Sequence, residues 1–441
     1  MRTCLALATS VVLAYAVPTT SAQTYFPPAD DAGTWATVEP TELDYCDAGL
    51  ARLDSFLAAT STRSFILLRD GRIAHERYFG GQDPAGLRTW NSSGKSLLAV
   101  LVATAVDRGL VGLDDPAGDY LGAGWTSCDT AAERAITLRH LLTMTSGLDD
   151  SGDVNCTDPA CLTCLAAPGS RWAYHTAAST QLTYVLEAAS GLSLNEYTRE
   201  VLLDETGIRG AWSRSGDNRF FASDARGFAR WSVLLGADLA WDGAPLIADT
   251  ALVRALTTPS QNLNPAYGYL FWLNGQSSYR LPGRPFEFLG AITPEAPSPT
   301  YYSIGKNGQI ASVAPGTGLT WVRMGVASAA GGRLVSTAYA DAVWTYVNAL
   351  ACASTSTGVD PPTRGGLAVY PNPAAGAMTI SADAELAAYA LLDPAGRTLR
   401  RGRLAGRAAT IDAAELPPGP YVVRIQLADG SSSTARVTVA P

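Results

Sequence analysis

The order of extended and helical segments between residues 41 and 351 is the feature that most restricts the fold of this chain. Two segments with strand character, at 64–68 and 73–78, flank Asp70-Gly71, a dipeptide that favours the tight turn of a β-hairpin. Helical patterns follow, and extended runs return only near the end. Because a doubly wound sheet would alternate strands and helices throughout, the order predicts an α/β (α+β) fold: an antiparallel sheet flanked by helices, with an inserted helical lobe.

Hydrophobic periodicity gives the expected bounds of the other elements. Helices are predicted at residues 97–109, 138–145, 179–190, 227–235 and 336–351. Strands are predicted at residues 301–304, 309–313 and 318–324. We assign all of these elements to one domain that covers residues 23–352.

The first 22 residues have the organisation of a secretory signal peptide. Arg2 precedes an apolar run from Cys4 to Val17, and small residues end the segment at Ala22. We expect cleavage after Ala22; the alternative is a buried N-terminal helix. No other stretch of about 20 residues is apolar enough to span a bilayer, so no membrane span is expected in the mature chain. A net charge of −8 argues against nucleic acid as a partner.

Six cysteines would remain after cleavage, and an even number in an exported chain favours disulfides. They are Cys46, Cys128, Cys156, Cys161, Cys164 and Cys352. Cys46 and Cys352 lie at the two ends of the main domain, where a bridge between them would tie those ends together. The other four lie around a Gly/Asp-rich loop, and zinc binding is the alternative for them.

Lysine is almost absent, since 30 of the 32 basic residues are arginine and only Lys95 and Lys306 are lysine. The two residue types serve almost equally well on a solvated surface, but a buried lysine can lose its proton near neutral pH and an arginine cannot. The scarcity therefore marks these two positions as places where the chemistry requires lysine. The alternative is that both were retained by chance.

Lys95 lies three residues after Ser92, just before a helical run, so both side chains would share one face of a first helical turn. A desolvated lysine amine is able to take the proton of a serine hydroxyl and so activate it as a nucleophile. Such a four-residue pattern is weak evidence alone, because it recurs by chance. Gly94-Lys95-Ser96 also resembles the end of a phosphate-binding loop, but Thr89 stands where that motif requires glycine.

Lys306 belongs to a Lys306-Asn307-Gly308 triplet between two predicted strands. Glycine on an edge strand allows backbone and substrate to approach closely. We expect the N–H groups of Gln309 and Ser92 to hold a developing oxyanion, with the Lys306 ammonium beside the pocket. The alternative is a solvated lysine in a turn.

These motifs together resemble those of the serine β-lactamases and penicillin-binding proteins. Ser92-x-x-Lys95 and Lys306-Asn307-Gly308 correspond to the Ser-x-x-Lys and Lys-Thr-Gly motifs of that superfamily. Further similar segments are residues 136–148, 168–174, 267–272 and 305–309. Within the superfamily the chain looks most like the class C-related hydrolases, which include esterases, D-aminopeptidases, DD-peptidases and 6-aminohexanoate-oligomer hydrolases.

The resemblance implies that Tyr174 assists proton transfer, as the tyrosine of the family's Tyr-x-Asn motif does. Thr176 stands where that motif has asparagine, so the amide that would bind a substrate carbonyl is missing. This departure argues against antibiotics and cell-wall peptides as substrates. A packed core tyrosine is the alternative for Tyr174. The neighbouring His175 either contacts the pocket or points away from it.

The resemblance implies a secreted serine hydrolase that cleaves an ester or amide bond in a small or peptide-like substrate. Ser92 would form an acyl-enzyme, Lys95 and Tyr174 would transfer the proton, and Lys306 would steer a substrate carboxylate or polarise Tyr174. The alternatives are a β-lactamase or D-Ala-D-Ala peptidase, and a non-catalytic secreted binding protein on the same fold. No metal or organic cofactor is implied.

The C-terminal part of the chain has a different texture. Residues 353–366 form a Ser/Thr/Pro/Gly-rich linker, and the β-rich runs that follow predict a small β-sandwich at 367–441. Its segments at 369–373 and 418–425 resemble the type A sorting domain of type IX secretion. The resemblance implies the type IX machinery as a partner, and a secreted or cell-surface location. An accessory β-domain, such as a carbohydrate binder, is the alternative.

Overall fold

The computed structural model of the chain describes residues 23–29, 34–284, 286–326, 336–351 and most of 368–439. It divides into two compact units, residues 1–352 and 353–441. The predicted signal peptide, Cys352, the linker at 353–366 and the segment 371–373 lie outside the described residues.

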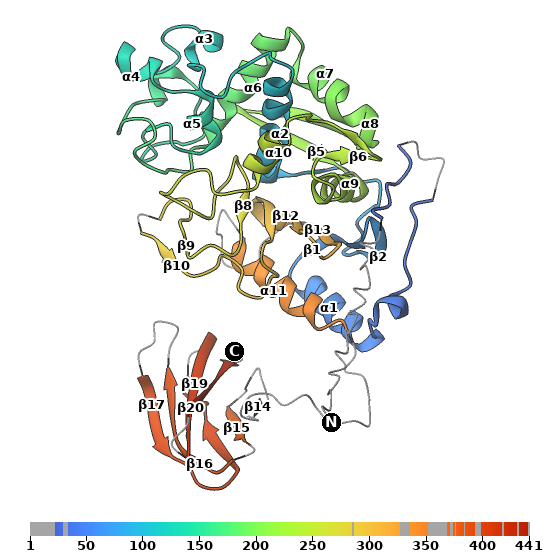
Figure 1. The fold of residues 1–441 in the computed structure, drawn as a ribbon, viewed down its shortest axis with the longest axis vertical. Coiled ribbons are helices and arrows are strands. Elements are labelled where there is room, and N and C mark those ends of the chain that lie inside the picture. The colour runs from blue at the N-terminus through green and yellow to red at the C-terminus, as the bar shows by residue number, and fades with distance from the viewer. Residues whose placement is uncertain are drawn as a thin grey trace, which may run out of the picture. The chain divides into compact units, whose positions relative to one another are not determined.

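The first unit is built on a six-stranded antiparallel sheet with the strand order β2-β1-β13-β12-β11-β8 (Figure 1). The strands are β1 (Thr62–Arg69), β2 (Arg72–Tyr78), β8 (Trp272–Leu273), β11 (Tyr301–Gly305), β12 (Gln309–Ala314) and β13 (Leu319–Gly325). Because β1 pairs with β13, the N-terminal hairpin joins the strands that end the unit. This arrangement confirms the predicted antiparallel sheet with a lobe inserted between its two halves.

Helices cover both faces of this sheet. They are α9 (Ala225–Gly236) on one face, and α1 (Asp47–Ala59) and α11 (Thr337–Asn348) on the other. Successive side chains of a strand point to opposite faces, and β13 shows the alternation. Thr320 hydrogen bonds with Ser232 of α9, whereas the ring of Trp321 lies 6.3 Å from that of Trp344 of α11.

The inserted lobe is centred on α2 (Gly94–Asp107), whose residues are almost all buried. Around it lie α3 (Gly118–Leu121), α4 (Thr130–Arg134), α5 (Leu138–Leu142), α6 (Thr176–Ser190), α7 (Leu194–Thr198), α8 (Asp204–Thr206) and α10 (Thr250–Leu256). A small sheet formed by β3 (Arg88–Thr89), β4 (Gly210–Ser215) and β5 (Asn218–Ser223) completes it, and the sequence did not predict these strands. Within the described ranges, no helix has the length and apolar character that crossing a membrane requires.

Two short hairpins lie in the second half of the unit. They pair β6 (Ala240–Trp241) with β7 (Ala244–Pro245), and β9 (Ser278–Tyr279) with β10 (Phe288–Leu289).

The four clustered cysteines form two disulfides, Cys128–Cys164 and Cys156–Cys161. This pairing confirms the disulfide interpretation for the loop and rules out the zinc alternative there, since a thiolate pair joined as a disulfide no longer binds metal. The bridge between Cys46 and Cys352 stays a prediction, because Cys352 is not among the described residues.

The second unit contains two antiparallel sheets that share one core, which confirms the predicted β-sandwich. One sheet has the order β14-β15-β18, with β14 (Ala368–Tyr370), β15 (Ala377–Ser381) and β18 (Ala408–Asp412). The other has the order β17-β16-β19-β20, with β16 (Leu386–Leu392), β17 (Thr398–Arg403), β19 (Gly419–Leu427) and β20 (Ser432–Val439). The sequence did not predict β17 and β18, whose side chains are mostly exposed and lack an apolar alternation.

Candidate active site

Ser92 lies in a single helical turn, Asn91–Ser93, that leads directly into α2. The preceding Trp90 is fully buried and anchors the turn, since its indole N–H donates to Ser223 Oγ over 2.8 Å. Asn91 has a positive φ of 50°, and its side-chain amide donates to the backbone oxygen of Lys306 over 2.9 Å. The turn that carries Ser92 is therefore tied both to the lobe and to the end of β11.

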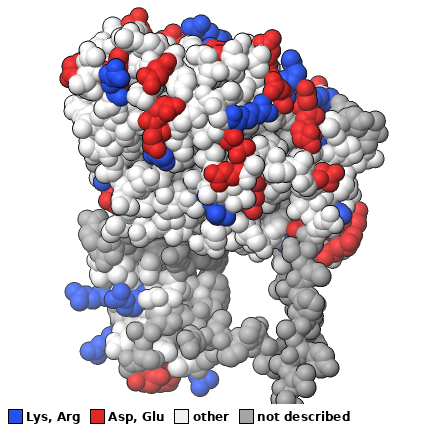
Figure 2. Space-filling view, turned by 45° about the horizontal axis from the view of Figure 1, so that its top comes forward, with Lys and Arg blue, Asp and Glu red and all other residues white. Residues whose placement is uncertain are grey.

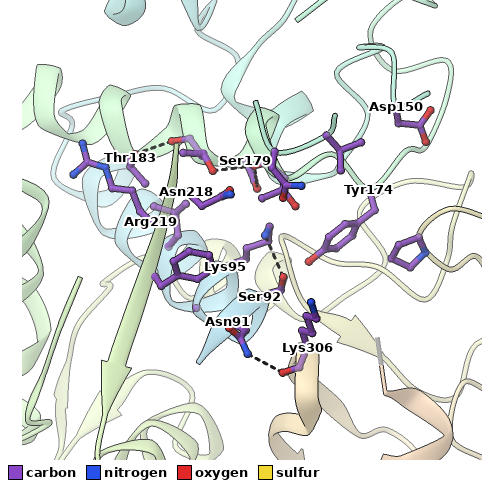
Figure 3. Close-up of a pocket in the computed structure, with 18 of the residues that line it drawn as sticks. Asn91, Ser92, Lys95, Asp150, Tyr174, Ser179, Thr183, Asn218, Arg219 and Lys306 are labelled. Carbon is purple, nitrogen blue, oxygen red and sulfur yellow. Dashed lines mark hydrogen bonds between the residues drawn. The ribbon is translucent and has the colours of Figure 1, made fainter. Parts of the chain in front are cut away.

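Lys95 lies one turn further along α2, and its Nζ is 3.3 Å from Ser92 Oγ (Figure 3). Burial lowers the pKa of Lys95 from 10.5 to about 8, because the ammonium form loses its hydration. Within the described residues, no acidic side chain forms an ion pair with this amine. A neutral amine is therefore accessible near neutral pH, at hydrogen-bond distance from a serine hydroxyl.

Tyr174 lies across the cavity, and its hydroxyl points towards Ser92 and Lys95 (Figure 3). Lys95 Nζ is 5.4 Å from the centre of the Tyr174 ring. Burial raises the pKa of Tyr174 to about 12, and a hydrogen bond with Ser92 partly opposes that rise. The ring packs against Trp272 and Tyr267, which belong to the 267–272 segment. Tyr174 is thus a neutral, rigidly packed hydroxyl beside the serine.

These groups line a cavity of about 480 Å³. One wall is a row of hydroxyl-bearing residues on α6: Thr176, Ser179, Thr180 and Thr183. An adjoining wall, in contact with α6, comes from the small sheet and includes Trp212, Asn218, Arg219 and Phe220. Of these wall residues, only Thr176 was predicted from the sequence. The spacing of the four hydroxyl residues, at i, i+3, i+4 and i+7, is that of one helix face and was the available signal.

The turn after β11 carries the second lysine. Lys306 is exposed and lines the mouth of the cavity, where its side chain points towards Ser92 (Figure 3). Asn307 and Gly308 both have positive φ, and their backbone oxygens accept hydrogen bonds from the buried Arg323 guanidinium at 2.8 and 3.0 Å. They shape the turn and are not among the residues that line the cavity.

Gln309 lies in the sheet, opposite Gly305 in the β11–β12 ladder. Its buried side chain hydrogen bonds with the backbone of Gly325 at 2.7 and 3.2 Å, and it does not line the cavity. On the other side of β11, the N–H of Asn274, which follows β8, donates to the oxygen of Thr300. The even-numbered residues of β11 therefore direct their backbone groups towards β8 and away from β12. Gly305 is extended, so that alternation continues to Lys306. The N–H of Lys306 is thereby placed on the side of the strand that faces the Ser92 turn.

His175 is buried and caps the N-terminus of α6, where its Nδ1 accepts the backbone N–H of Ala178 over 3.1 Å. It does not line the cavity, which decides the question that the sequence left open. His140 likewise forms a capping interaction with Thr137 at the start of α5.

A β-lactamase family model matches residues 53–335, which is more than half of the chain. The chain belongs to the β-lactamase family. Residues 368–440 match the model of a secretion system C-terminal sorting domain, which indicates type IX secretion and a secreted or cell-surface location. No curated protein sequence matches this β-lactamase-family chain.

Solved structures share the fold of the first unit. A penicillin-binding protein homologue from Caulobacter crescentus has a TM-score of 0.52 at 15% identity, over 72% of this chain and 99% of that one. A β-lactamase from Mycobacterium bovis has a TM-score of 0.50 at 21% identity, over 68% and 98%. A family VIII carboxylesterase has a TM-score of 0.52 at 13% identity, over 69% and 98%. At these identities the likeness shows the fold alone.

Proposed function

We propose that the first unit is a secreted serine hydrolase that cleaves an ester or amide bond through an acyl-enzyme on Ser92. The observation that carries the proposal is the 3.3 Å contact between Ser92 Oγ and a lysine amine whose pKa is lowered to about 8. Ser92 attacks the substrate carbonyl while Lys95 takes its proton. The proton passes to the leaving group, with the Tyr174 hydroxyl as relay, and water then hydrolyses the acyl-enzyme.

The oxyanion that forms in each step needs two backbone donors. We assign the N–H of Ser92 as one of them. For the second we replace the expected Gln309 by Lys306, because Gln309 pairs with Gly305 inside the sheet whereas the backbone of Lys306 faces the Ser92 turn. Lys306 would then contribute twice: its N–H would bind the oxyanion, and its ammonium would steer an anionic substrate towards the cavity.

Esters are the favoured substrates in this proposal. Thr176 lines the cavity where the family motif has asparagine, and a hydroxyl offers one donor where an amide offers two. A solved structure with the same fold is described as a carboxylesterase. Activity as a β-lactamase or D-Ala-D-Ala peptidase, and ligand binding without turnover, are the alternatives that the following experiment separates.

Covalent labelling tests the proposed nucleophile. A fluorophosphonate probe should label the wild-type protein at Ser92, and the Ser92→Ala variant should lose both the label and at least about 10³-fold of its activity on phenyl acetate. Mass spectrometry of the labelled peptide identifies the site. Ser93→Ala is the matched control, because that neighbouring serine is buried and does not line the cavity. Absence of labelling together with absence of turnover on short-chain esters would favour a binding protein.

Nitrocefin separates the enzymatic alternatives. We expect hydrolysis of phenyl acetate and very slow hydrolysis of nitrocefin or D-alanyl-D-alanine peptides, because the asparagine amide is missing at Thr176. Efficient nitrocefin hydrolysis would instead assign the protein as a β-lactamase.

The pH dependence should report Lys95. Because Lys95 acts as a base only when neutral, kcat/KM should rise with pH and level off above the pKa of about 8. One unit below that value, at pH 7, about a tenth of the plateau should remain. The measurement is kcat/KM for phenyl acetate between pH 6 and 10.5. If the Tyr174 phenolate were the base, its pKa of about 12 would keep the rate rising through the whole range.

Export completes the proposal. The signal peptide at 1–22 would direct the chain out of the cytoplasm, and the sorting domain would engage the type IX machinery. Two disulfides in the first unit agree with an oxidising location.

A further inference from the structure

A second cavity of about 480 Å³ adjoins the first. Tyr174, Asp150 and Gly283 line both cavities, so the two spaces meet at the proposed proton relay. The other residues that line the second cavity include Arg171, Trp172, Leu263, Arg280, Leu281 and Arg284. A group bound there would belong to the same substrate that Ser92 attacks.

The charged residues that line this second cavity are mostly basic. Three are arginines and one is Asp150, although the chain as a whole carries a net charge of −8. On the face of the molecule shown in Figure 2, acidic and basic side chains are interspersed over the large unit, without a comparable basic excess. Such an excess in a concave site raises the local concentration of anions.

The carboxylates near this cavity do not match its arginines one for one. Asp150 pairs with Arg171. Arg280 pairs with Glu287, with 3.6 Å between Nη2 and Oε2. Arg284 is exposed, and no described carboxylate forms an ion pair with it. The cavity therefore retains positive charge after its internal pairs are counted.

Hydrogen bonds fix the side chain of Arg280 and the backbone of Arg284. Arg280 follows β9, its Nε donates to the oxygen of Leu263 over 2.9 Å, and its backbone N–H donates to Asn264 Oδ1 over 3.0 Å. The backbone N–H of Arg284 donates to the oxygen of Leu281 over 3.2 Å, which closes the turn between them. Trp172 and Leu281 supply an apolar surface beside these cations. Guanidinium groups beside an apolar wall suit a carboxylate at the end of a hydrocarbon or aryl spacer.

We infer that the second cavity is an anion subsite, and that the enzyme's substrates carry a carboxylate which binds Arg280 and Arg284 while Ser92 attacks the scissile carbonyl. This inference rests on the proposed hydrolase function. It narrows the substrate class from esters in general to monoanionic esters whose charge lies away from the bond that is cleaved.

Two matched substrate pairs test the inference by kcat/KM. In one pair, 4-acetoxybenzoate, which carries its charge on the leaving group, is compared with its neutral methyl ester. In the other, phenyl hydrogen glutarate, which carries its charge on the acyl group, is compared with phenyl methyl glutarate, and phenol release is measured. We expect Arg284→Gln to lower kcat/KM about three- to tenfold for the anionic member of at least one pair, with the neutral member changed less than twofold. Arg280→Gln should act in the same direction.

Arg254→Gln is the matched control, because Arg254 is an exposed arginine on α10 that lines neither cavity. It should leave both members of each pair unchanged. The preference for the anion should also weaken as the salt concentration rises, since exposed charges are screened. The inference would be overturned if Arg284→Gln and Arg280→Gln lowered kcat/KM equally for anionic and neutral substrates, or for neither. Turnover of phenyl acetate would in that case still support the proposed function.

A binding measurement makes the outcome independent of turnover. If no ester is hydrolysed, the proposed function fails, and saturation-transfer NMR with benzoate and with its neutral analogue benzamide decides the inference. Benzoate should give the stronger signal, and an Arg280→Gln, Arg284→Gln double variant should lose that difference. Equal signals from benzoate and benzamide in the wild-type protein would refute the anion subsite.

Discussion

Replacing Lys95 with methionine should abolish ester turnover and at the same time stabilise the enzyme unit. The loss should be about 10³-fold in kcat/KM, because the Ser92 hydroxyl would lose the base that takes its proton. Lys95→Arg should be equally inactive, since arginine keeps the positive charge but does not release its proton. The arginine variant thereby separates a role as a base from a role as a charge.

The gain in stability follows from the sign of the pKa shift. The folded state lowers the pKa of Lys95 from 10.5 to about 8, so the folded state disfavours the charged form. Below pH 8 this penalty is fully present. Between pH 8 and 10.5 the folded state is neutral while the unfolded chain is still charged, so the penalty falls as the pH rises and ends near pH 10.5, where the unfolded chain also loses its proton. Lys95→Met should therefore raise the free energy of unfolding at pH 7 by about 1–3 kcal/mol, and the gain should vanish near pH 10.5.

Urea unfolding at pH 7 and at pH 10.5 measures this gain. Lys306→Met is the control for stability, because Lys306 is exposed and its removal should give no comparable gain. An active Lys95→Met variant would contradict the proposed mechanism. An inactive variant with lowered stability at pH 7 would show that Lys95 has a structural role instead.

Much of the fold was predictable because its signals are local. The Asp70-Gly71 turn, the apolar run of α2 and the strands β11 to β13 each carry their own periodicity, and the predicted bounds lie within a few residues of those in the structure. The strands β4 and β5 were not predicted, since most of their side chains are exposed or half-buried and only the pairing with each other and with β3 makes them strands. Residues of β4 and β5 form one wall of the cavity, so that wall could not be predicted either.

The site was predictable to a similar extent. Ser92 and Lys95 are neighbours on one helix, so their contact follows from helix geometry. The distance between Tyr174 and Lys95, by contrast, depends on how the lobe packs, and only the family motif pointed to it. Gln309 was predicted at the start of the strand 309–313, and the structure confirms that place. The motif could not show that Gln309 pairs with Gly305 across the β11–β12 ladder, because the turn between the two strands sets that register.

Gly305→Ala should lower kcat/KM for phenyl acetate by about 10²-fold or more, although it adds only one methyl group outside the catalytic residues. A Cβ at Gly305 would lie 3.1 Å from the backbone nitrogen of Ser92, 2.9 Å from that of Ser93, and closer still to the oxygen of Trp90. These neighbours are backbone atoms held by Trp90 and Asn91, so they yield only if the whole turn moves. A shift of about 1 Å in a nucleophile is enough for a loss of this size.

The displaced turn should also cost stability, by about 1–3 kcal/mol, because the added methyl group overfills a closed contact. Gly118→Ala is the matched control: its Cβ would approach the Trp125 indole to 3.6 Å, an ordinary contact, and both activity and stability should stay near wild type. Fluorophosphonate labelling of Ser92 in Gly305→Ala, measured together with the unfolding midpoint, distinguishes a misplaced nucleophile from an unfolded chain. A folded Gly305→Ala variant with wild-type labelling would show that β11 does not fix the position of Ser92, and the assignment of Lys306 as the second oxyanion donor would lose its basis.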